Sequence, residues 1–198
     1  MHESLPVVHL ARHGETAWSL SGQHTGLTDL PLTAAGEDDA RSLGERLRKL
    51  VATRVFTSPL KRARHTCDLA ALSTPAQIDP DLVEWDYGDY EGRRTSEIHV
   101  DRPGWNVFRD GCPGGESPED VLTRAHRVIR RLRSDTGNVI VFSSGHFLRV
   151  LASAWIGLDT RGGGLLILST ASLSALGYEH NQHEPAIRLW NDTTHLAK

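Results

Sequence analysis

Cysteines and long apolar runs are scarce in this sequence. Its 198 residues include two cysteines, Cys67 and Cys112. They lie too far apart to form a Cys-x-x-Cys pair, so neither a disulfide framework nor a cysteine metal site is predicted. No apolar run approaches the roughly 18 residues that a membrane-spanning helix needs. The first residues lack a basic flank before an apolar stretch, which argues against a secretory signal. We therefore expect a reduced, cytoplasmic protein without a membrane partner.

Positive charge is not in excess either. Lys and Arg number 22 against 25 Asp and Glu, for a formal net charge of −3. Such a chain is not a general nucleic-acid binder, so a site for an anion must be a local cluster of arginines. A hydrophobic content of 38% over 198 residues is enough for one sizeable core. Because there is no internal repeat or low-complexity linker, residues 1–198 are expected to form a single domain.

Short apolar runs alternate with segments of helical periodicity. The strand candidates are residues 5–10, 55–57, 139–142, 171–176 and 186–190. The helix candidates are residues 34–50, 61–72, 118–132 and 148–157. Thr33 and Ser117 are residue types that cap helices. This order predicts an α/β fold, a three-layer sandwich with a mostly parallel central sheet flanked by helices. Residues 88–116 are expected to form an irregular wall over a pocket.

The stretch Leu10–Thr16 places reactive side chains at the end of the first strand. Arg12 and His13 follow the apolar run and precede Gly14. They should therefore lie at the carboxyl edge of the sheet, where ligands bind in open α/β folds. The planar guanidinium group of an arginine can hold a phosphate through two parallel hydrogen bonds. Because a neutral imidazole beside it can attack phosphorus, the pattern indicates phosphoryl transfer.

Three further blocks follow along the chain, namely Ser58–Thr66, Leu82–Gly92 and Ser143–Arg149. With the first block, and in this order, they resemble the histidine phosphatase superfamily, which includes the cofactor-dependent phosphoglycerate mutases and many small phosphatases. The resemblance runs from about residue 5 to about residue 176. Within it, the segment Ser21–Thr33 is most similar to the branch that acts on sugar phosphates and sugar bisphosphates.

The resemblance assigns roles to four residues. It implies that His13 is the nucleophile and that Arg12 and Arg62 bind the phosphate. Glu84 becomes the general acid, and later the base for the water that cleaves the phosphohistidine. The residue types agree with these roles, because two nearby arginines disfavour a charged imidazole and keep His13 nucleophilic. A bound phosphate dianion beside Glu84 favours the protonated carboxyl group that a general acid needs.

The fourth block departs from the family pattern. The family has its second catalytic histidine in the segment H-G-x-x-x-R, and alignment on Gly145 and Arg149 puts Ser144 at that position. His146 matches the second histidine of H-G-H sequences in the sugar-phosphate branch, and we expect it to bind phosphate. Losing one donor to a developing charge costs about 10²–10³ in rate. Three explanations stay open. Ser144 is an engineered replacement, or it is natural and His146 or a water fills the gap, or the chain binds phosphorylated ligands without turnover.

Substrate contacts are expected from residues around these blocks. His24, Thr25 and Gly26 lie in the loop after the first block and are candidates to bind a sugar hydroxyl or a second phosphate. Tyr87 is a candidate for the pocket wall. Arg149 is either a ligand for a distal anionic group or a helix-face arginine paired with an acid.

No metal or cofactor is predicted. The sequence has no His-Glu-x-x-His motif and no cysteine cluster, and His180 and His183 form only a loose His-x-x-His that we interpret as a solvated turn. The superfamily that the chain resembles needs no metal, because its arginines and histidines carry the positive charge.

The preferred hypothesis is a phosphatase for small-molecule phosphate esters, with sugar phosphates or bisphosphates favoured, that acts through a phosphohistidine at His13. The alternative outside the enzymes is a non-catalytic relative that binds phosphate ligands. A phosphoglycerate mutase-type phosphotransferase is less favoured, because a mutase must shield its phosphohistidine with a closing lid. Only about 60 residues separate Glu84 from Ser144, where the mutases carry a longer segment. The sequence makes no prediction of the oligomeric state.

Overall fold

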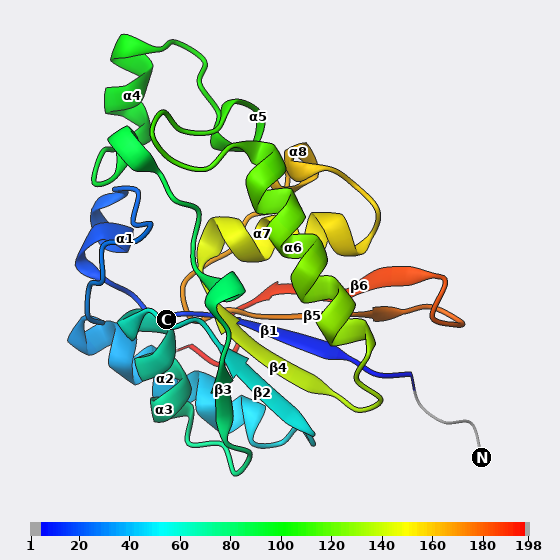
Figure 1. Ribbon diagram of the computed structural model, residues 1–198. Helices are drawn as coiled ribbons and strands as arrows, with labels where there is room; N and C mark the ends of the chain where they lie inside the picture. Colours follow the sequence, from blue (N-terminus) through cyan, green and yellow to red (C-terminus); the bar gives the residue numbers. More distant parts are fainter. Residues whose placement is uncertain (1–4, 197–198) are drawn as a thin grey trace.

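One six-stranded sheet organises the structure, a computed structural model that describes residues 5–196 (Figure 1). The strands are β1 (Val8–Arg12), β2 (Arg54–Thr57), β3 (Ala76–Ile78), β4 (Val139–Ser143), β5 (Leu173–Tyr178) and β6 (Pro185–Asp192). They lie in the order β3-β2-β4-β1-β5-β6. The first four strands in this order are parallel, whereas β5 is antiparallel to β1 and to β6. The predicted α/β fold with a mostly parallel sheet is confirmed.

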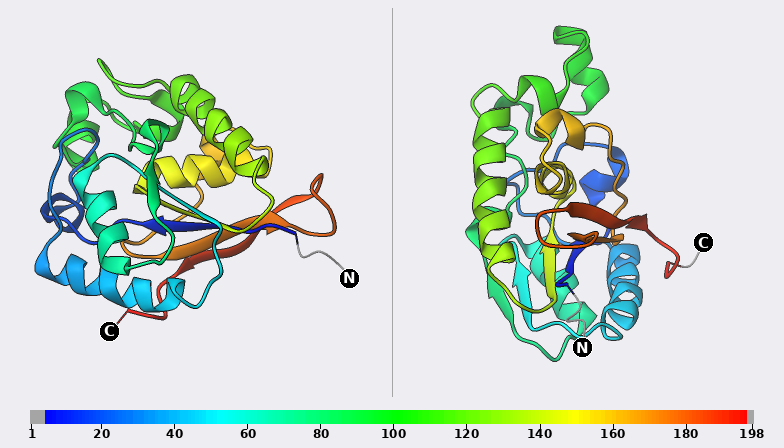
Figure 2. Two further views of the ribbon diagram at one scale, coloured as in Figure 1. Left: turned by 60° about the horizontal axis from the view of Figure 1, so that its bottom comes forward. Right: turned by 90° about the vertical axis from the view of Figure 1, so that its right-hand side faces the viewer.

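Helices cover both faces of the sheet (Figure 2). The larger helices are α2 (Ala34–Leu47), α3 (Lys61–Ala70), α6 (Pro118–Arg133) and α7 (Gly145–Trp155). In β4, Val139 and Val141 belong to the core under α6 and α7, while Ile140 and Phe142 belong to the core under α2 and α3. Alternate side chains of a strand point to opposite faces, so a continuous apolar run makes a strand that is buried on both sides. The result is the predicted three-layer sandwich.

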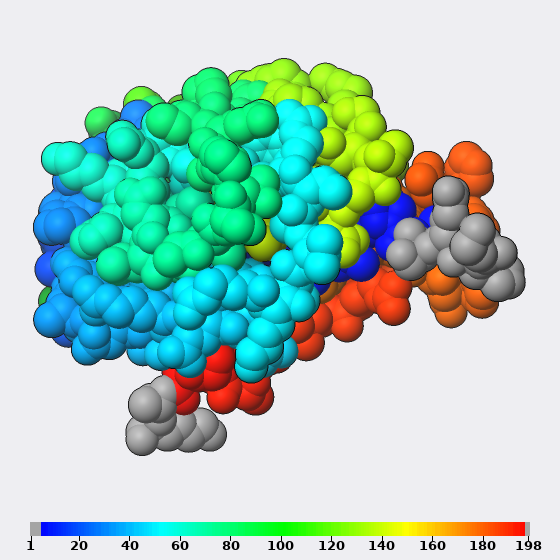
Figure 3. Space-filling model, turned by 90° about the horizontal axis from the view of Figure 1, so that it is seen from below, coloured from blue at the N-terminus to red at the C-terminus, as the bar shows by residue number. Residues whose placement is uncertain are grey.

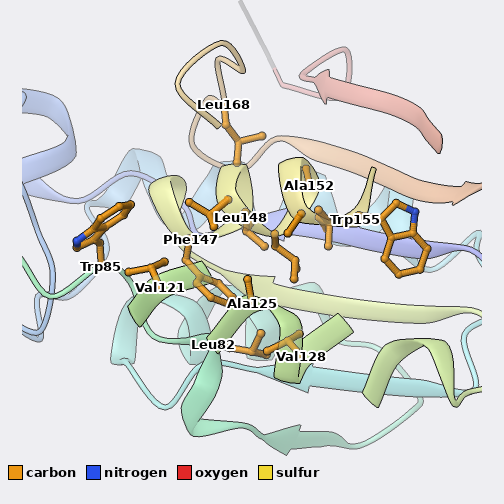
Figure 4. Close-up of a cluster of buried hydrophobic side chains, with 14 of the residues drawn as sticks. Leu82, Trp85, Val121, Ala125, Val128, Phe147, Leu148, Ala152, Trp155 and Leu168 are labelled. Atoms are coloured by element: carbon orange, nitrogen blue, oxygen red, sulfur yellow. The ribbon is translucent and has the colours of Figure 1, made fainter. Parts of the chain in front are cut away.

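The core under α6 and α7 holds the start of α7 in place (Figure 4). Phe147 of α7 meets Val121 and Ala125 of α6 there, and Trp85 and Trp155 are buried in the same core. Burying a side chain of this size contributes about 1.5–3 kcal/mol to folding. Since Phe147 lies in the first turn of α7, the same packing fixes the neighbouring residues that face the site.

The predicted helix caps are present. Thr33 Oγ1 accepts a hydrogen bond from Gly36 N at 3.0 Å, and Ser117 Oγ accepts one from Asp120 N at 3.2 Å. The Asp120 carboxylate accepts in turn from Ser117 N at 3.0 Å, which completes a capping box before α6. The helix predicted over 61–72 ends earlier, at Ala70, because Ala71 adopts a left-handed φ of 49°.

The helix predicted over 148–157 begins three residues earlier than expected. The chain passes from β4 into α7 through Ser144 alone, so Gly145, His146 and Phe147 form the first turn of the helix. The prediction was wrong because the local sequence does not show that Phe147 packs in the core, and that packing draws Gly145, His146 and Phe147 into the helix. The first helical turn, with its free N–H groups, therefore faces the carboxyl edge of the sheet.

The other element boundaries differ by a few residues. The first strand extends through Arg12, and the two late strands occupy 173–178 and 185–192 rather than 171–176 and 186–190. The helix predicted over 34–50 ends at Leu47. Strand β3 was not predicted, because its three residues are exposed at the sheet edge and show no apolar pattern. Cys67 packs in the core under α2 and α3.

Residues 88–116 contain short helices instead of the expected irregular loop. They are η2 (Gly88–Tyr90), α4 (Thr95–Asp101) and α5 (Val107–Asp110), and α4 stands at the top of Figure 1. A bridge between Gln23 and Arg94 ties this segment to the loop that follows α1 (Ala17–Ser21). Gly88 has a φ of 49°, and a Cβ atom there would lie 2.2 Å from Pro113 O, so only glycine fits.

The remaining short helices are η1 (Pro80–Leu82) and α8 (Thr160–Gly163). Figure 3 shows the face that carries α2 and α3, with the β5–β6 hairpin projecting at one end. No helix within residues 5–196 combines the length and the apolar character that crossing a bilayer requires.

Candidate active site

A cavity of about 230 Å³ opens at the carboxyl ends of β1 and β4, where α7 begins. Eight residues that the sequence analysis singled out line it: Arg12, His13, His24, Thr25, Glu84, Tyr87, His146 and Arg149. Three others lie behind this lining instead of in it: Gly26, Arg62 and Ser144. The sheet edge therefore collects residues that are up to 137 positions apart in the sequence, from Arg12 to Arg149.

His13 presents one ring nitrogen to the main chain and the other to the cavity. Its Nδ1 lies 2.7 Å from Gly14 O. Because a carbonyl oxygen only accepts, Nδ1 carries the proton and Nε2 keeps a lone pair. Burial, with Arg62 and Arg12 nearby, holds the pKa of His13 well below its usual 6.5. The ring is therefore neutral near pH 7 and its Nε2 is available as a nucleophile.

Arg12, the last residue of β1, lies beside the start of α7. Its Nη1 donates to Leu168 O. A Cβ atom added to Gly145 would lie 3.2 Å from Arg12 Nε, so the first turn of α7 packs directly against the guanidinium group. Arg12 Nε is buried and has no hydrogen-bond partner among residues 5–196. A buried donor without an acceptor costs about 1–3 kcal/mol, so this N–H is available to a ligand oxygen.

Arg62, in the first turn of α3, is fully buried. Its Nη1 donates to Thr28 O at 3.0 Å, and its Nη2 donates to Gly26 O at 2.8 Å and to Thr25 O at 3.1 Å. Its Nε has no partner within the described part of the chain. Arg62 therefore holds the 25–28 loop with one end of its guanidinium group and keeps the remaining N–H free.

Ser144 is the register neighbour of His13. Arg12 of β1 is paired with Ser143 of β4, and His13 N donates to Ser143 O at 3.0 Å. The next residues of these parallel strands, His13 and Ser144, therefore lie side by side. Ser144 is fully buried, and its Oγ has no partner in the part of the chain that the structure describes. We refer to Arg12, His13, Arg62 and Ser144 as the polar floor.

Glu84 reaches from the segment after η1 to the N-terminus of α7. Its Oε1 accepts hydrogen bonds from Trp85 N at 2.9 Å and Phe147 N at 2.7 Å, and its Oε2 accepts one from His146 N at 2.9 Å. The positive end of the helix and these N–H groups hold the carboxyl group in one place. Oε2 has a single N–H partner, so it retains a lone pair that can bind a proton at the cavity.

Opposite the floor, aromatic and histidine side chains pair with one another. The Tyr87 hydroxyl contacts His146 Nδ1, and His24 Nε2 lies 3.2 Å from Thr95 Oγ1. The His24 and Tyr87 rings pack at an angle of 41°, with their centroids 4.7 Å apart. Burial lowers the pKa of His24 to about 4. We refer to His24, Tyr87, Thr95 and His146 as the histidine wall.

Glu91 secures the loop that carries Thr25 and Gly26. Gly26 N lies 2.9 and 3.0 Å from the two Glu91 carboxylate oxygens, and Thr28 N donates to Oε1 at 3.1 Å. A Cβ atom on Gly26 would lie 2.6 Å from Trp85 O, so a larger residue has no room. Thr25 lines the cavity, whereas Gly26 supports Arg62 from behind the lining.

Arg149 lines the cavity, which is consistent with a ligand for a distal anionic group, and it is not paired with an acid among the described residues. Its Nε donates to Gly163 O at 2.9 Å and its Nη2 to Gly164 O at 3.3 Å, and its guanidinium group lies 4.4 Å from the centre of the Phe108 ring. Its partners among the described residues are carbonyl oxygens and no carboxylate. The positive charge therefore remains available at the cavity.

Six lining residues were not among the predicted site residues, namely Ser19, Gly22, Gln23, Thr95, Gly145 and Leu168. Gly22 belongs to the segment Ser21–Thr33 and Gly145 to the fourth block, so both lie in stretches that the sequence analysis had marked. Ser19 and Gln23 flank or occupy the loop that was already singled out, so proximity to that loop was a usable signal. Thr95 and Leu168 belong to no motif, and only the packing of their segments brings them to the cavity.

Potential metal ligands gather at the β5–β6 hairpin. Within residues 5–196 the one group of three comprises Glu179, His180 and Glu184, all exposed, and His180 Nδ1 lies 2.7 Å from Glu184 Oε2. His183, the other histidine of the loose motif, is exposed as well. Residues next to this hairpin pair with Val8, at the amino end of β1, so the group lies away from the cavity at the carboxyl end.

The geometry suits binding and transfer of a tetrahedral oxyanion. The polar floor combines a neutral imidazole nitrogen with two guanidinium N–H groups and one hydroxyl group that lack partners within residues 5–196. The non-bridging oxygens of a phosphoryl group accept hydrogen bonds from such donors. Glu84 is the one carboxyl group among the described residues that line the cavity, so it is placed to exchange a proton with a leaving oxygen.

Comparison with known proteins agrees with this geometry. The histidine phosphatase superfamily (branch 1) matches residues 8–193. The match covers nearly the whole chain, and the chain belongs to this superfamily. The residues that carry the resemblance in the sequence are those that the fold brings to the cavity and to the floor behind it.

The relatives include named phosphatases. A sedoheptulose 1,7-bisphosphatase of Saccharomyces cerevisiae is 41% identical over 185 residues, which cover 77% of this chain and 68% of the relative. An acid phosphatase of Mycobacterium tuberculosis is 38% identical over 182 residues, which cover 90% and 89%. The solved structure of an open reading frame product of Mycobacterium tuberculosis superposes with a TM-score of 0.89 at 35% identity, over 94% and 97% of the two chains. Salmonella proteins named as probable phosphoglycerate mutases also match.

Proposed function

We propose that this protein is a phosphatase that hydrolyses small phosphate esters, with sugar phosphates or bisphosphates preferred, through a phosphohistidine at His13. The observation that carries the proposal is the buried, neutral ring of His13, whose Nε2 borders a floor of unpartnered donors within the described chain. The family membership and the names of the sedoheptulose bisphosphatase and acid phosphatase relatives support the same class.

The first chemical step forms the phosphohistidine. The lone pair of His13 Nε2 attacks phosphorus while the ester P–O bond breaks, and the non-bridging oxygens are bound by Arg12 and Arg62. Glu84 gives its proton to the leaving alcohol oxygen. The proton on Nδ1 stays on the ring and is donated to Gly14 O throughout, so the phosphorylated ring needs no further proton transfer.

The second step releases phosphate. A water molecule gives a proton to the Glu84 carboxylate and attacks phosphorus as the P–N bond breaks, so the bonding electrons return to His13 Nε2. Both residues end in their starting states. His24, Thr25 and Arg149 line the cavity and are proposed to contact the remainder of the substrate, and His146 is proposed to contact the phosphoryl group.

Hydrolysis is favoured over the mutase reaction because the cavity has little cover. In the described structure the segment 88–116 contributes Thr95 alone to the cavity lining. A mutase must keep water from its phosphohistidine, which needs a lid over the site. Here water can reach the phosphohistidine directly.

Phosphate release and covalent labelling test the proposal together. Sugar monophosphates, sugar bisphosphates and p-nitrophenyl phosphate labelled at the phosphoryl group should release phosphate between pH 5 and 8. Stopping the reaction with alkaline denaturant should leave a base-stable, acid-labile label on His13, located by mass spectrometry. H180A, which changes an exposed histidine of the β5–β6 hairpin, is the matched control. Tight binding of inorganic phosphate without turnover would instead support the binding relative, and turnover without label on His13 would exclude the mechanism.

A further inference from the structure

His146 is the one residue of the histidine wall that lies in α7, the helix that directly follows Ser144. It lies two positions after Ser144, in the first turn of α7, and its ring lines the cavity. Its main-chain N–H binds Glu84 Oε2 at 2.9 Å, which places it directly beside the proposed general acid. The ring packs edge-on against Phe108, with centroids 5.0 Å apart. Its position is therefore set by both the main chain and the side chain.

The hydrogen bond between Tyr87 and His146 determines which ring nitrogen faces the cavity as a donor. Burial raises the pKa of Tyr87 well above 10, so its hydroxyl keeps the proton. Burial, with Arg149 and His24 nearby, holds the pKa of His146 well below 6.5, so the ring is neutral and carries one proton. Within residues 5–196 the Tyr87 hydroxyl has His146 Nδ1 as its partner.

Only one proton arrangement satisfies both groups. If Nδ1 carried the proton, the Tyr87 hydroxyl proton would need a second acceptor, and the described structure provides none. If Tyr87 donates to Nδ1, both groups are satisfied and the proton of His146 lies on Nε2. A neutral His146 then offers an N–H donor to the cavity.

On the basis of the proposed phosphatase function, we infer that His146 Nε2–H donates to a phosphoryl oxygen in place of the histidine that Ser144 lacks, and that Tyr87 is the positioning residue that sets this tautomer. Ser144 cannot supply the same donor at the same reach, because its side chain is shorter than that of histidine and its hydroxyl group cannot carry a positive charge. A neutral donor is roughly half as strong as a charged one, so the replacement is partial.

A double-mutant cycle in kcat separates this role from a structural one. H146F keeps a ring in the wall and removes the donor, and it should lower kcat for p-nitrophenyl phosphate by about 10²-fold. In the S144H background the restored histidine makes His146 redundant, so the same H146F change should cost less than about fivefold. H146Q, which retains an N–H donor, should recover part of the loss in the original background.

Equal losses in both backgrounds would overturn the inference while leaving the phosphatase function intact. Absence of turnover in the original chain and in S144H alike would overturn the proposed function and the inference with it. Thermal melts of each variant verify folding, and H180Q, which changes an exposed hairpin histidine, should retain the original kcat.

The tautomer has a readout that does not depend on activity. In ¹⁵N spectra of the folded chain, His146, identified by its loss in H146Q, should show protonated Nε2 and unprotonated Nδ1. Y87F keeps the tyrosine ring but removes its hydroxyl, so it should shift His146 to a mixture of tautomers and lower kcat more than it raises KM. An unchanged His146 spectrum in Y87F would rule out the positioning role.

Discussion

The polar floor and the histidine wall border one cavity but meet their hydrogen-bonding needs in different ways. In the floor, Arg12 Nε, Arg62 Nε and Ser144 Oγ are buried without a partner among residues 5–196. In the wall, Tyr87 pairs with His146, and His24 pairs with Thr95. The floor therefore carries an energetic cost that a bound oxyanion can relieve, whereas the two hydrogen-bonded pairs of the wall form before any ligand arrives.

The two regions also differ in how they are assembled. Three floor residues lie at the ends of parallel strands or immediately after them, so strand register determines their spacing. The wall comes from the loop after α1, the segment 84–95 and the first turn of α7, which meet only through packing. We expect changes in the floor and at His146 to act on catalysis, and changes in the rest of the wall to act first on orientation and stability.

The largest effect that tests this comparison is expected from H13A. Removing the nucleophile of the floor should lower kcat/KM by on the order of 10⁴-fold or more, because the covalent route is lost. The measurement is steady-state hydrolysis of p-nitrophenyl phosphate, with H180A as the control. If the kcat/KM of H13A stayed within tenfold of the original value, His13 would not be the nucleophile. The floor would then not differ from the wall in its part in catalysis.

The next largest effect is expected from S144H. A cationic donor beside His13 should raise kcat by about 10²–10³-fold, since it stabilises the charge on the transferring group. S144A is the matched control and should not raise kcat, because it removes the Ser144 hydroxyl group without adding a cationic donor. If S144H folds normally in a thermal melt and leaves kcat unchanged, position 144 has no catalytic part in the floor.

The wall should show its contribution in the pH dependence of stability. Burial lowers the pKa of His24 to about 4 in the folded chain, against the usual 6.5 of a histidine in the unfolded chain. The unfolded chain therefore binds more protons than the folded chain between these two pH values. The free energy of unfolding should therefore fall by about 3 kcal/mol as the pH drops from 6.5 to below 4, with no contribution from His24 above 6.5. Urea unfolding of the original chain and H24Q across this range measures the difference. Parallel pH curves for the two proteins would contradict the prediction.

The smallest effect is expected from E91Q, which weakens the hydrogen bonds that hold the loop of residues 25–28 between the floor and the wall. A glutamine has one acceptor oxygen where Glu91 uses two for Gly26 N and Thr28 N. Unfolding should become easier by about 1 kcal/mol, and KM should rise a few-fold because the loop that Arg62 holds is less well placed. E97Q removes a comparable carboxylate from the start of α4 and should lower stability without raising KM. A KM rise of equal size in both variants would argue against a specific role for Glu91.

The sequence predicted much of the polar floor, and also Glu84, for a simple reason. Arg12 and His13 directly follow an apolar strand, and Glu84 precedes a conspicuous Trp-Asp-Tyr-Gly segment, so motif order and strand position were sufficient to group them. The ends of parallel strands meet at one edge of a sheet, which converts sequence position into spatial proximity. The two arginine neighbours predicted a neutral His13, and in the structure burial is the main cause that lowers the pKa of His13, with Arg62 and Arg12 adding to it.

Hydrogen-bond partners could not be predicted in the same way. The sequence around Arg62 did not indicate that its guanidinium group would donate three hydrogen bonds to carbonyl oxygens of residues 25–28. It also did not indicate that Arg62 would lie behind the cavity lining. The contact of Tyr87 with His146 spans 59 positions, and that of Glu84 with Phe147 spans 63. Such partners depend on where distant segments come to rest, which short-range patterns do not specify.

The sequence by itself determined the α/β class, the alternation of strands and helices, and the identity of the residues at the sheet edge, because side-chain periodicity and strand ends are local properties. Tertiary structure alone decided that α7 begins at Gly145, that Glu84 binds its first turn, and that the wall residues form hydrogen-bonded pairs while three floor atoms have no partner among residues 5–196. The physical reason is that buried hydrogen bonds are allocated only after packing has removed water from competing donors and acceptors.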